Sequence, residues 1–267
     1  MWLRLFKESL NFAWSAIVMN KLRTFLSLLG VMVGIFVISA IFAVVDSMED
    51  DLMESFSMLD DDVLFVSKWP WSMGGDYPWW KYIQRREPTL KDSNELASRL
   101  TQASDVSFQM KAMFDLESGD NSFPNVAVAA VSHTYPNVVS MDIAKGRFFN
   151  DSESASGRGM AIVGYDVAMN LFGTEDALGK KFKIAGQKLE VIGTFTQQGA
   201  SIVSNGFDEF VVVPATFAPR IFDTRNNAGN TIMVKAKDGV DLAILKDEII
   251  QQFRSVRRVR PSAVDDF

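Results

Sequence analysis

The 267-residue chain contains no cysteine and a single histidine, His133. Without cysteine there is no disulfide, no thiol nucleophile, no Cys-ligated zinc and no lipid-modified N-terminal cysteine. One histidine excludes a multi-histidine metal site and leaves little room for a histidine-based relay. The net charge of −6 argues against a surface that covers nucleic acid. Most of the common side-chain sets for catalysis are therefore missing.

The short motifs of nucleotide and hydrolytic sites are missing as well. The sequence has no Gly-rich loop ending in Gly-Lys-Ser/Thr, no dinucleotide-binding glycine spacing and no Gly-x-Ser-x-Gly elbow to accompany His133. The three aspartates at 60–62 lack the alternating ligands and the glycine of a calcium loop. We expect no catalytic residue, no cofactor and no metal, and we expect His133 to be a hydrogen-bonded polar residue at a strand end.

An apolar run over residues 25–45 dominates what is present, with 21 residues and no charge. As a helix it would be about 30 Å long, the thickness of a bilayer core. Gly30 and Gly34 lie four residues apart on one face, where small residues let helices pack closely. A core helix would show a polar face, and a cleaved signal peptide usually has an apolar core of only about 7–15 residues. We predict a transmembrane helix, with cleavage as the open alternative.

The charge on either side of this run predicts its orientation. Residues 1–45 carry a net charge of +3 and the remainder carries −9. Because positive flanks stay in the cytoplasm, we expect an inner-membrane protein with a cytoplasmic N-terminus and a periplasmic or extracytoplasmic main domain. The pattern of residues 1–24 predicts an amphipathic helix in the membrane interface, and an exposed leader is the alternative.

Four of the six tryptophans, Trp69, Trp71, Trp79 and Trp80, lie within residues 69–88, together with three prolines. This composition predicts a long irregular loop. Exposed aromatic side chains usually contact something. The four are therefore candidates for contact with a partner protein or with lipid, and packing on their own domain is the open alternative.

After residue 45 the pattern mixes helices and strands, which indicates an α+β domain. Helical periodicity extends the first helix to about residue 59 and returns at 92–103, with Asp92 or Ser93 as its N-cap, at 165–172 and at 241–259. Strands are expected at 63–66, 105–116, 123–132, 160–163, 179–184, 188–195, 210–213 and 232–236. A basic cluster near the C-terminus either faces lipid phosphates or an acidic partner, or ends a solvated helix: Arg254, Arg257, Arg258 and Arg260.

Motifs in a fixed order resemble those of MacB-like ABC transporter permeases, the MacB, FtsX and LolC type. Residues 20–34 read NKLRTFLSLLGVMVG, which is similar to the first membrane helix of that family. Later segments are similar to its following motifs: KGRFF at 145–149, AIVG at 161–164, LFG at 171–173, LGK at 178–180, VIG at 191–193 and VVP at 212–214. Each motif is weak alone, and their order makes the resemblance specific. It covers nearly the whole chain and is poorest over residues 67–90.

The resemblance implies one N-terminal transmembrane helix followed by a two-lobed extracytoplasmic domain. Residues 60–115 and 230–260 would form a βαβ-type lobe, and residues 116–229 an inserted, mainly β lobe. Such permeases are implied to have four membrane helices. Residues 261–267 would then lead into a second membrane helix that this sequence lacks, so the chain is expected to be an N-terminal part or a truncated copy.

By the same resemblance the chain is a permease subunit and not an enzyme. It is implied to couple ATP hydrolysis by a partner to movement of the outer lobes, for export, lipoprotein release or control of the cell envelope. The implied partners are a cytoplasmic ABC-type ATPase, a second permease copy or a paralogue, an envelope or outer-membrane protein, and the lipid bilayer. The alternative is a signal-anchored extracytoplasmic domain that binds a partner and transports nothing.

Overall fold

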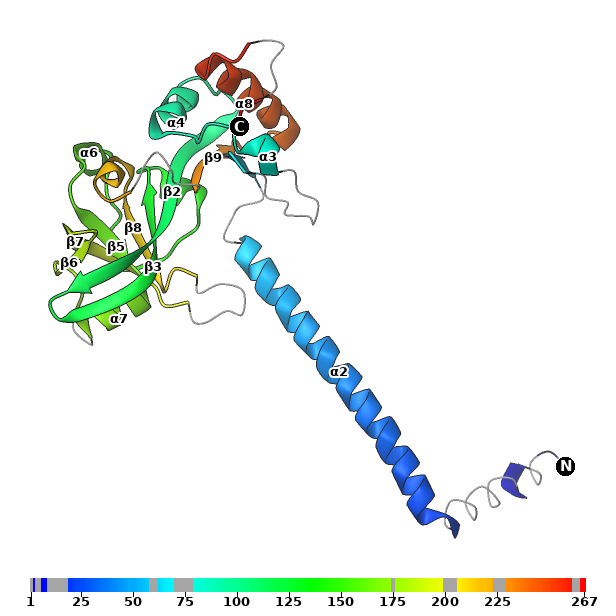
Figure 1. Ribbon diagram of the computed structural model, residues 1–267. Helices are drawn as coiled ribbons and strands as arrows, with labels where there is room; N and C mark the ends of the chain where they lie inside the picture. The colour runs from blue at the N-terminus through cyan, green and yellow to red at the C-terminus, as the bar shows by residue number, and fades with distance from the viewer. Residues whose placement is uncertain are drawn as a thin grey trace. The chain divides into compact units, whose positions relative to one another are not determined.

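The computed structural model describes residues 2, 6–8, 19–57, 62–69, 79–173, 176–198, 206–222, 229–260 and 265–267 (Figure 1). The chain divides into two compact units, Met1–Met53 and Glu54–Phe267. The predicted interfacial helix at residues 1–24 lies largely outside the described residues.

Helix α2 (Lys21–Ser57) supplies most of the first unit. Its stretch Lys21–Val45 has a mean hydropathy of 2.9, and none of it is buried. Apolar side chains are exposed on every face, as for Ile35 and Phe36, so the helix requires apolar surroundings. By length and composition it can cross a bilayer, a test that an N-terminal signal sequence also passes. The predicted apolar N-terminal helix is confirmed, and its backbone remains helical to Ser57.

The second unit is built on one mixed sheet, whose described strands number nine. They are β1 (Val63–Ser67), β2 (Ala103–Ser118), β3 (Asn121–Val131), β4 (Ile143–Gly146), β5 (Met160–Val163), β6 (Lys181–Ile184), β7 (Gln187–Phe195), β8 (Phe210–Pro214) and β9 (Asn230–Ala236). The order is β1-β9-β2-β3-β8-β5-β7-β4, and β6 pairs with both β2 and β7. The predicted α+β class is confirmed.

Short helices connect and cover these strands. They are α3 (Trp79–Tyr82), α4 (Leu90–Ala97), α5 (Tyr135–Val138), α6 (Asp151–Ser156), α7 (Tyr165–Phe172), the 3-10 helix η1 (Ala215–Arg220) and α8 (Leu242–Val256). Helix α7 has the bounds that its pattern predicts. The sequence pattern does not predict α3, α5, α6 or η1, because elements of four to six residues are too short to show a helical period.

One end of the sheet has a split βαβ arrangement. Strands β1 and β2, with α4 between them in the chain, are both antiparallel to β9, which lies between them. Helices α4 and α8 lie together at this end (Figure 1). Helix α8 buries Leu245, Ile249 and Phe253 in the same cluster as Leu96 of α4 and Val66 of β1. This apolar face of α8 is therefore its packing face.

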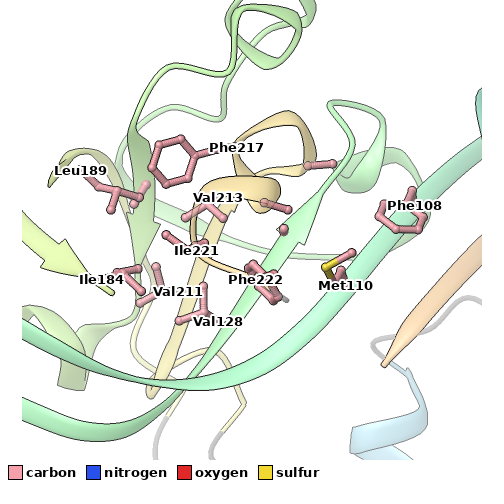
Figure 2. Close-up of a cluster of buried hydrophobic side chains, with 14 of the residues drawn as sticks. Phe108, Met110, Val128, Ile184, Leu189, Val211, Val213, Phe217, Ile221 and Phe222 are labelled. Atoms are coloured by element: carbon pink, nitrogen blue, oxygen red, sulfur yellow. The ribbon is translucent and has the colours of Figure 1, made fainter. Parts of the chain in front are cut away.

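The rest of the sheet buries both of its faces. Along β8, Val211 and Val213 belong to one apolar cluster, whereas Val212 belongs to the other, as the two-residue period of a strand requires. Figure 2 shows Val211 and Val213 gathered with Val128 of β3, Ile184 of β6, Leu189 of β7 and Phe217 of η1. The sheet is continuous from β1 to β4. The division into two lobes, at residues 115–116 and 229–230, stays a prediction.

The N-cap predicted for α4 was wrong. Thr89 is the cap: its Oγ1 accepts a hydrogen bond from the Asp92 backbone N–H (3.1 Å), and the Asp92 carboxylate accepts one from the Thr89 N–H (3.1 Å). This is a capping box, in which the residue taken for the cap supplies the reciprocal N3 side chain. The helix ends at Ala97, before the Ala103 that the pattern predicted.

Two glycines of the quoted motifs are required by close backbone contacts. A Cβ on Gly164 would lie 2.1 Å from the Asp208 carbonyl oxygen, and one on Gly146 would lie 2.2 Å from the Ile192 carbonyl oxygen. Gly146 also has a φ of +81°, which favours glycine. In the segments KGRFF and AIVG, glycine is thus needed so that neighbouring strands and loops can approach.

A second capping box predicts how stability depends on pH. Asn150 and Glu153 cap α6, and the Glu153 carboxylate also accepts bidentate hydrogen bonds from Arg147 (2.6 and 2.7 Å). The Arg147 hydrogen bonds, followed by that from the Asn150 backbone N–H, lower the pKa of Glu153 from 4.5 to about 2. Because the folded-state pKa is depressed, this carboxylate stabilises the fold above pH 4.5, and the contribution is lost as the pH falls toward about 2.

We therefore expect Glu153→Gln to lower the free energy of unfolding at pH 7 by about 1 kcal/mol. The difference from the unmodified protein should shrink between about pH 4.5 and pH 2. Thermal unfolding of the detergent-solubilised chain at several pH values measures both. Glu117→Gln, which changes an exposed carboxylate on β2, is the matched control. A Glu153→Gln deficit that stays constant with pH would contradict this assignment.

Candidate functional site: an arginine clasp

The described residues include no group of three or more His, Asp or Glu side chains placed to hold a metal ion. His133 follows β3, and its Nδ1 lies 3.3 Å from Asp151 Oδ1. The His133 side chain is 44% exposed and that of Asp151 80%. His133 is thus a surface residue with a polar partner, as predicted. An ion pair this exposed contributes little to stability.

The structure describes the side chains of only two of the four candidate tryptophans. Trp69, after β1, is half-buried: Ser67 Oγ donates a hydrogen bond to its carbonyl oxygen (2.7 Å), and Lys68 Nζ lies 5.5 Å from its ring centroid. Trp80, in α3, is 59% exposed. Trp71 and the side chain of Trp79 lie outside the described residues. The proposed contact surface stays a prediction, and Trp69 and Trp80 differ in burial.

Gly30 and Gly34 both lie within α2, four residues apart and therefore on one face. A Cβ at either position would meet no atom within 4 Å. Their role in packing against another helix stays a prediction.

A hollow of about 520 Å³ lies between β1 and α8. It brings together the start of the second unit and its last residues. The lining residues are Leu64, Phe65, Val66, Ser67, Trp69, Arg85, Lys246, Ile249, Ile250, Asp265 and Phe267. A second hollow, of about 500 Å³, lies between β4 and α7, with the Lys145–Asp176 ion pair (3.3 Å) among its lining residues.

Both interpretations of the C-terminal arginine cluster, contact with lipid phosphates or an acidic partner and a solvated helix end, are wrong for Arg257, whose side chain is only 2% exposed. Its Nη1 donates hydrogen bonds to the carbonyl oxygens of Arg86 (3.1 Å) and Asp266 (2.9 Å) and to Asp266 Oδ1 (3.3 Å). Nη2 lies 3.5 Å from Asp92 Oδ2, and the guanidinium lies over the Phe253 ring at 4.5 Å. A buried guanidinium requires such partners, since unpaired burial of a charge is costly.

Arg86 and Arg254 also contact the last described segment, residues 265–267. Arg86 donates from Nε to Asp266 Oδ2 (3.0 Å) and from Nη2 to the Arg257 carbonyl oxygen (3.3 Å). Arg254, one turn before Arg257 on α8, pairs with Asp265. We call this set the arginine clasp: Arg86, Arg254 and Arg257 with Asp92, Asp265 and Asp266. It fastens residues 265–267 to α8, to α4 and to the segment before α4.

A largely buried ion pair between Glu87 and Lys68 connects the clasp to the end of β1. Glu87 Oε1 lies 3.8 Å from Lys68 Nζ, and both side chains are about one-sixth exposed. Burial raises the pKa of Glu87, against the opposite effect of Lys68 and Arg257. Asn230 Nδ2 donates to the adjacent Pro88 carbonyl oxygen (2.9 Å). Residues 86–88 thus form a bridge held from β1, β9 and α8.

Sequence reasoning missed the clasp because its partners are far apart in the chain. Arg86 and Asp266 are separated by 180 residues, and Arg257 and Arg86 by 171. No local period records such a contact. Chemically the site holds two parts of its own backbone together through arginine donors directed at carboxylates and carbonyl oxygens, whereas the buried Arg257 Nη2 has no hydrogen-bond partner among the described residues and only approaches Asp92.

Comparison with known proteins supports the earlier resemblance. The family model of the MacB-like periplasmic core domain matches residues 24–252. The pyoverdine export ATP-binding/permease protein PvdT of Pseudomonas aeruginosa is 23% identical, over 82% of this chain and 32% of its own length. The macrolide export ATP-binding/permease protein MacB of Bdellovibrio bacteriovorus is 23% identical, over 97% and 39%. The chain therefore spans between 32% and 39% of these two relatives.

A solved structure shares the fold of the second unit. The periplasmic region of MacB from Actinobacillus actinomycetemcomitans superposes with a TM-score of 0.61 at 16% sequence identity. The match covers 77% of this chain and 88% of that one. At this identity the likeness concerns the fold alone.

The difference in burial between two tryptophans gives a testable prediction. Trp80→Ser should change the free energy of unfolding by less than about 0.5 kcal/mol, because the side chain is largely exposed. Trp69→Ser should lower it by about 2 kcal/mol, because apolar area is lost from the hollow beside β1. Thermal unfolding in detergent measures both. Loss of folding in Trp80→Ser would show that Trp80 packs on its own domain and would end its candidacy as a contact residue.

Proposed function

Since the chain belongs to the family of MacB-like periplasmic core domains, we propose that it is a permease subunit of an ABC transporter, or the N-terminal part of one. The observation that carries the proposal is the continuous match over residues 24–252, which includes both the exposed apolar helix and the mixed sheet. In this role the chain has no catalysis of its own, and a separate subunit hydrolyses ATP.

The charge distribution supports the proposed orientation. Residues 1–45 carry +3 and the remainder −9, so the N-terminus would stay in the cytoplasm and the second unit would lie in the periplasm. The ATPase would then meet the chain on the side of residues 1–24. The second unit would face the envelope, where its hollows and the Trp-rich segment are available to partners.

Helix α2 is suited to transmit motion mechanically from a cytoplasmic ATPase to the second unit. Helix α2 continues to Ser57, twelve residues beyond the apolar stretch that ends at Val45. A continuous helix carries a displacement along its axis, because every turn is hydrogen-bonded to the next. Closure of ATPase subunits in the cytoplasm would thus shift the second unit. The proposed tasks are export of peptides or small amphiphiles, lipoprotein release or control of a cell-envelope enzyme.

The test is affinity purification of the natural gene product from its own membranes, followed by mass spectrometry. We expect a P-loop ATPase in near-equal amount, and we expect none from the same membranes when the bait is untagged. Recovery of the bait alone would favour the alternative, an anchored extracytoplasmic binding domain without transport. Other proteins recovered with the ATPase would identify the envelope partner.

The small-residue face of α2 gives a second prediction, about pairing of the permease subunit with a second copy or a paralogue. Gly30→Leu with Gly34→Leu should weaken co-purification of two differently tagged copies by about fivefold, because close approach of the helices is blocked. Met32→Leu with Phe36→Leu changes the opposite face and is the matched control. Unchanged pairing in the glycine variant would remove these residues from the interface.

A further inference from the structure

The first strand of the second unit and its last described residues meet at one place. Strand β1 is the first strand after α2 in the chain, and residues 265–267 are the last described residues. Both line the hollow beside α8. Phe267 adds an edge-to-face contact with Phe253 at 4.8 Å.

Strand β1 and residues 265–267 are attached to the second unit by different contacts. Strand β1 is paired with β9 through five residues, so a displacement of β1 passes directly into the sheet. Residues 265–267 belong to no described strand or helix. Their described polar contacts are those of the arginine clasp, made by Arg86, Arg254 and Arg257.

Arg257 is at the centre of the clasp. It is the buried member, and it contacts the bridge at Arg86, the last segment at Asp266 and α4 at Asp92. From Asp266 the contacts continue through Arg86 and its neighbour Glu87 to Lys68, the residue after β1. A series of polar contacts thus runs from the last segment to the first. These contacts range from 2.9 Å, between Arg257 and the Asp266 carbonyl oxygen, to 3.8 Å, between Glu87 and Lys68, and the best shielded of them are those of the buried Arg257.

We propose that the arginine clasp makes the two ends of the second unit move as one body, with Arg257 as its positioning residue. The inference rests on the proposed function. When α2 shifts β1, the sheet moves with it through the β1–β9 pairing, and the clasp carries residues 265–267 along. Without the clasp, the last segment would remain behind, and its response to ATP would be reduced.

Hydrogen exchange of the transporter complex, with and without a non-hydrolysable ATP analogue, tests this. The readout is the nucleotide-dependent change in exchange of residues 265–267, with the change in β6 and β7 as the reference for movement of the sheet itself. Arg257→Gln should reduce that change by about fivefold, a coupling typical of linked sites. Arg258→Gln, the exposed neighbour on the same helix end, is the matched control and should leave it unaltered.

A second, less disruptive variant keeps the test decisive if Arg257→Gln does not fold. Asp266→Asn removes one carboxylate from a partly exposed position and leaves Asp92 to pair with Arg257. It should also reduce the nucleotide response by weakening the contacts of the carboxylate with Arg86 and Arg257, and the effects of Asp266→Asn and Arg257→Gln should be less than additive because they share the Arg257–Asp266 contact. Asp247→Asn, an exposed carboxylate on α8, is its control.

The outcomes separate the two proposals. If the unmodified complex contains no ATPase, or its second unit shows no response to the nucleotide, the proposed function fails. If the unmodified complex responds and a folded Asp266→Asn variant responds equally, the clasp is only structural and this inference is overturned. Loss of the response with normal recovery of the ATPase supports the clasp.

Discussion

The β2–β3 hairpin is the constraint on which the second unit depends. Strand β2 has 16 residues, about three times the common length of a strand. It pairs with β9 near its start, with β3 along its second half and with β6 at its end, while β3 pairs with β8. Strands β1, β5 and β7 are joined to this hairpin through one of these neighbours, and β4 is joined through β7. A long continuous strand couples the two ends of the sheet, because a ladder of backbone hydrogen bonds bends less readily than a loop.

Burial of both faces makes this frame rigid. The alternating residues of β3 and β8 enter two apolar clusters, one on each side of the sheet. Close packing on both faces transmits displacement, since core side chains have little free volume into which to move. A domain of this kind suits a role in which force arrives at one edge. Helix α2 would transmit that force to β1, and the sheet would distribute it. The arginine clasp would keep residues 265–267 attached to the moving sheet.

The elements that could be predicted from the sequence are those whose signals lie within a few neighbouring residues. The strands β5 and β7 and the helix α7 follow from apolar periodicity and from glycines at their ends. The motif glycines Gly146 and Gly164 were quoted for resemblance alone, and the structure adds the reason: backbone atoms of other segments lie where a side chain would be. The N-cap of α4 was predicted at Asp92 or Ser93, three or four residues too late, because Thr, Asp and Ser all cap helices and only the backbone shows that Thr89 is the N-cap.

By itself the sequence determined the class of the protein. A charge-free run of 21 residues specifies a membrane-compatible helix, the flanking charges predict its orientation, and the ordered motifs indicate the family. Only the tertiary structure decided which charged residues matter. Arg257 and Arg258 are adjacent and chemically identical, yet one is buried among carboxylates and carbonyls and the other is exposed. That difference arises from partners on three separate segments, at Arg86, Asp92 and Asp266, and the free energy of burying a charge depends on those partners, which no local pattern records.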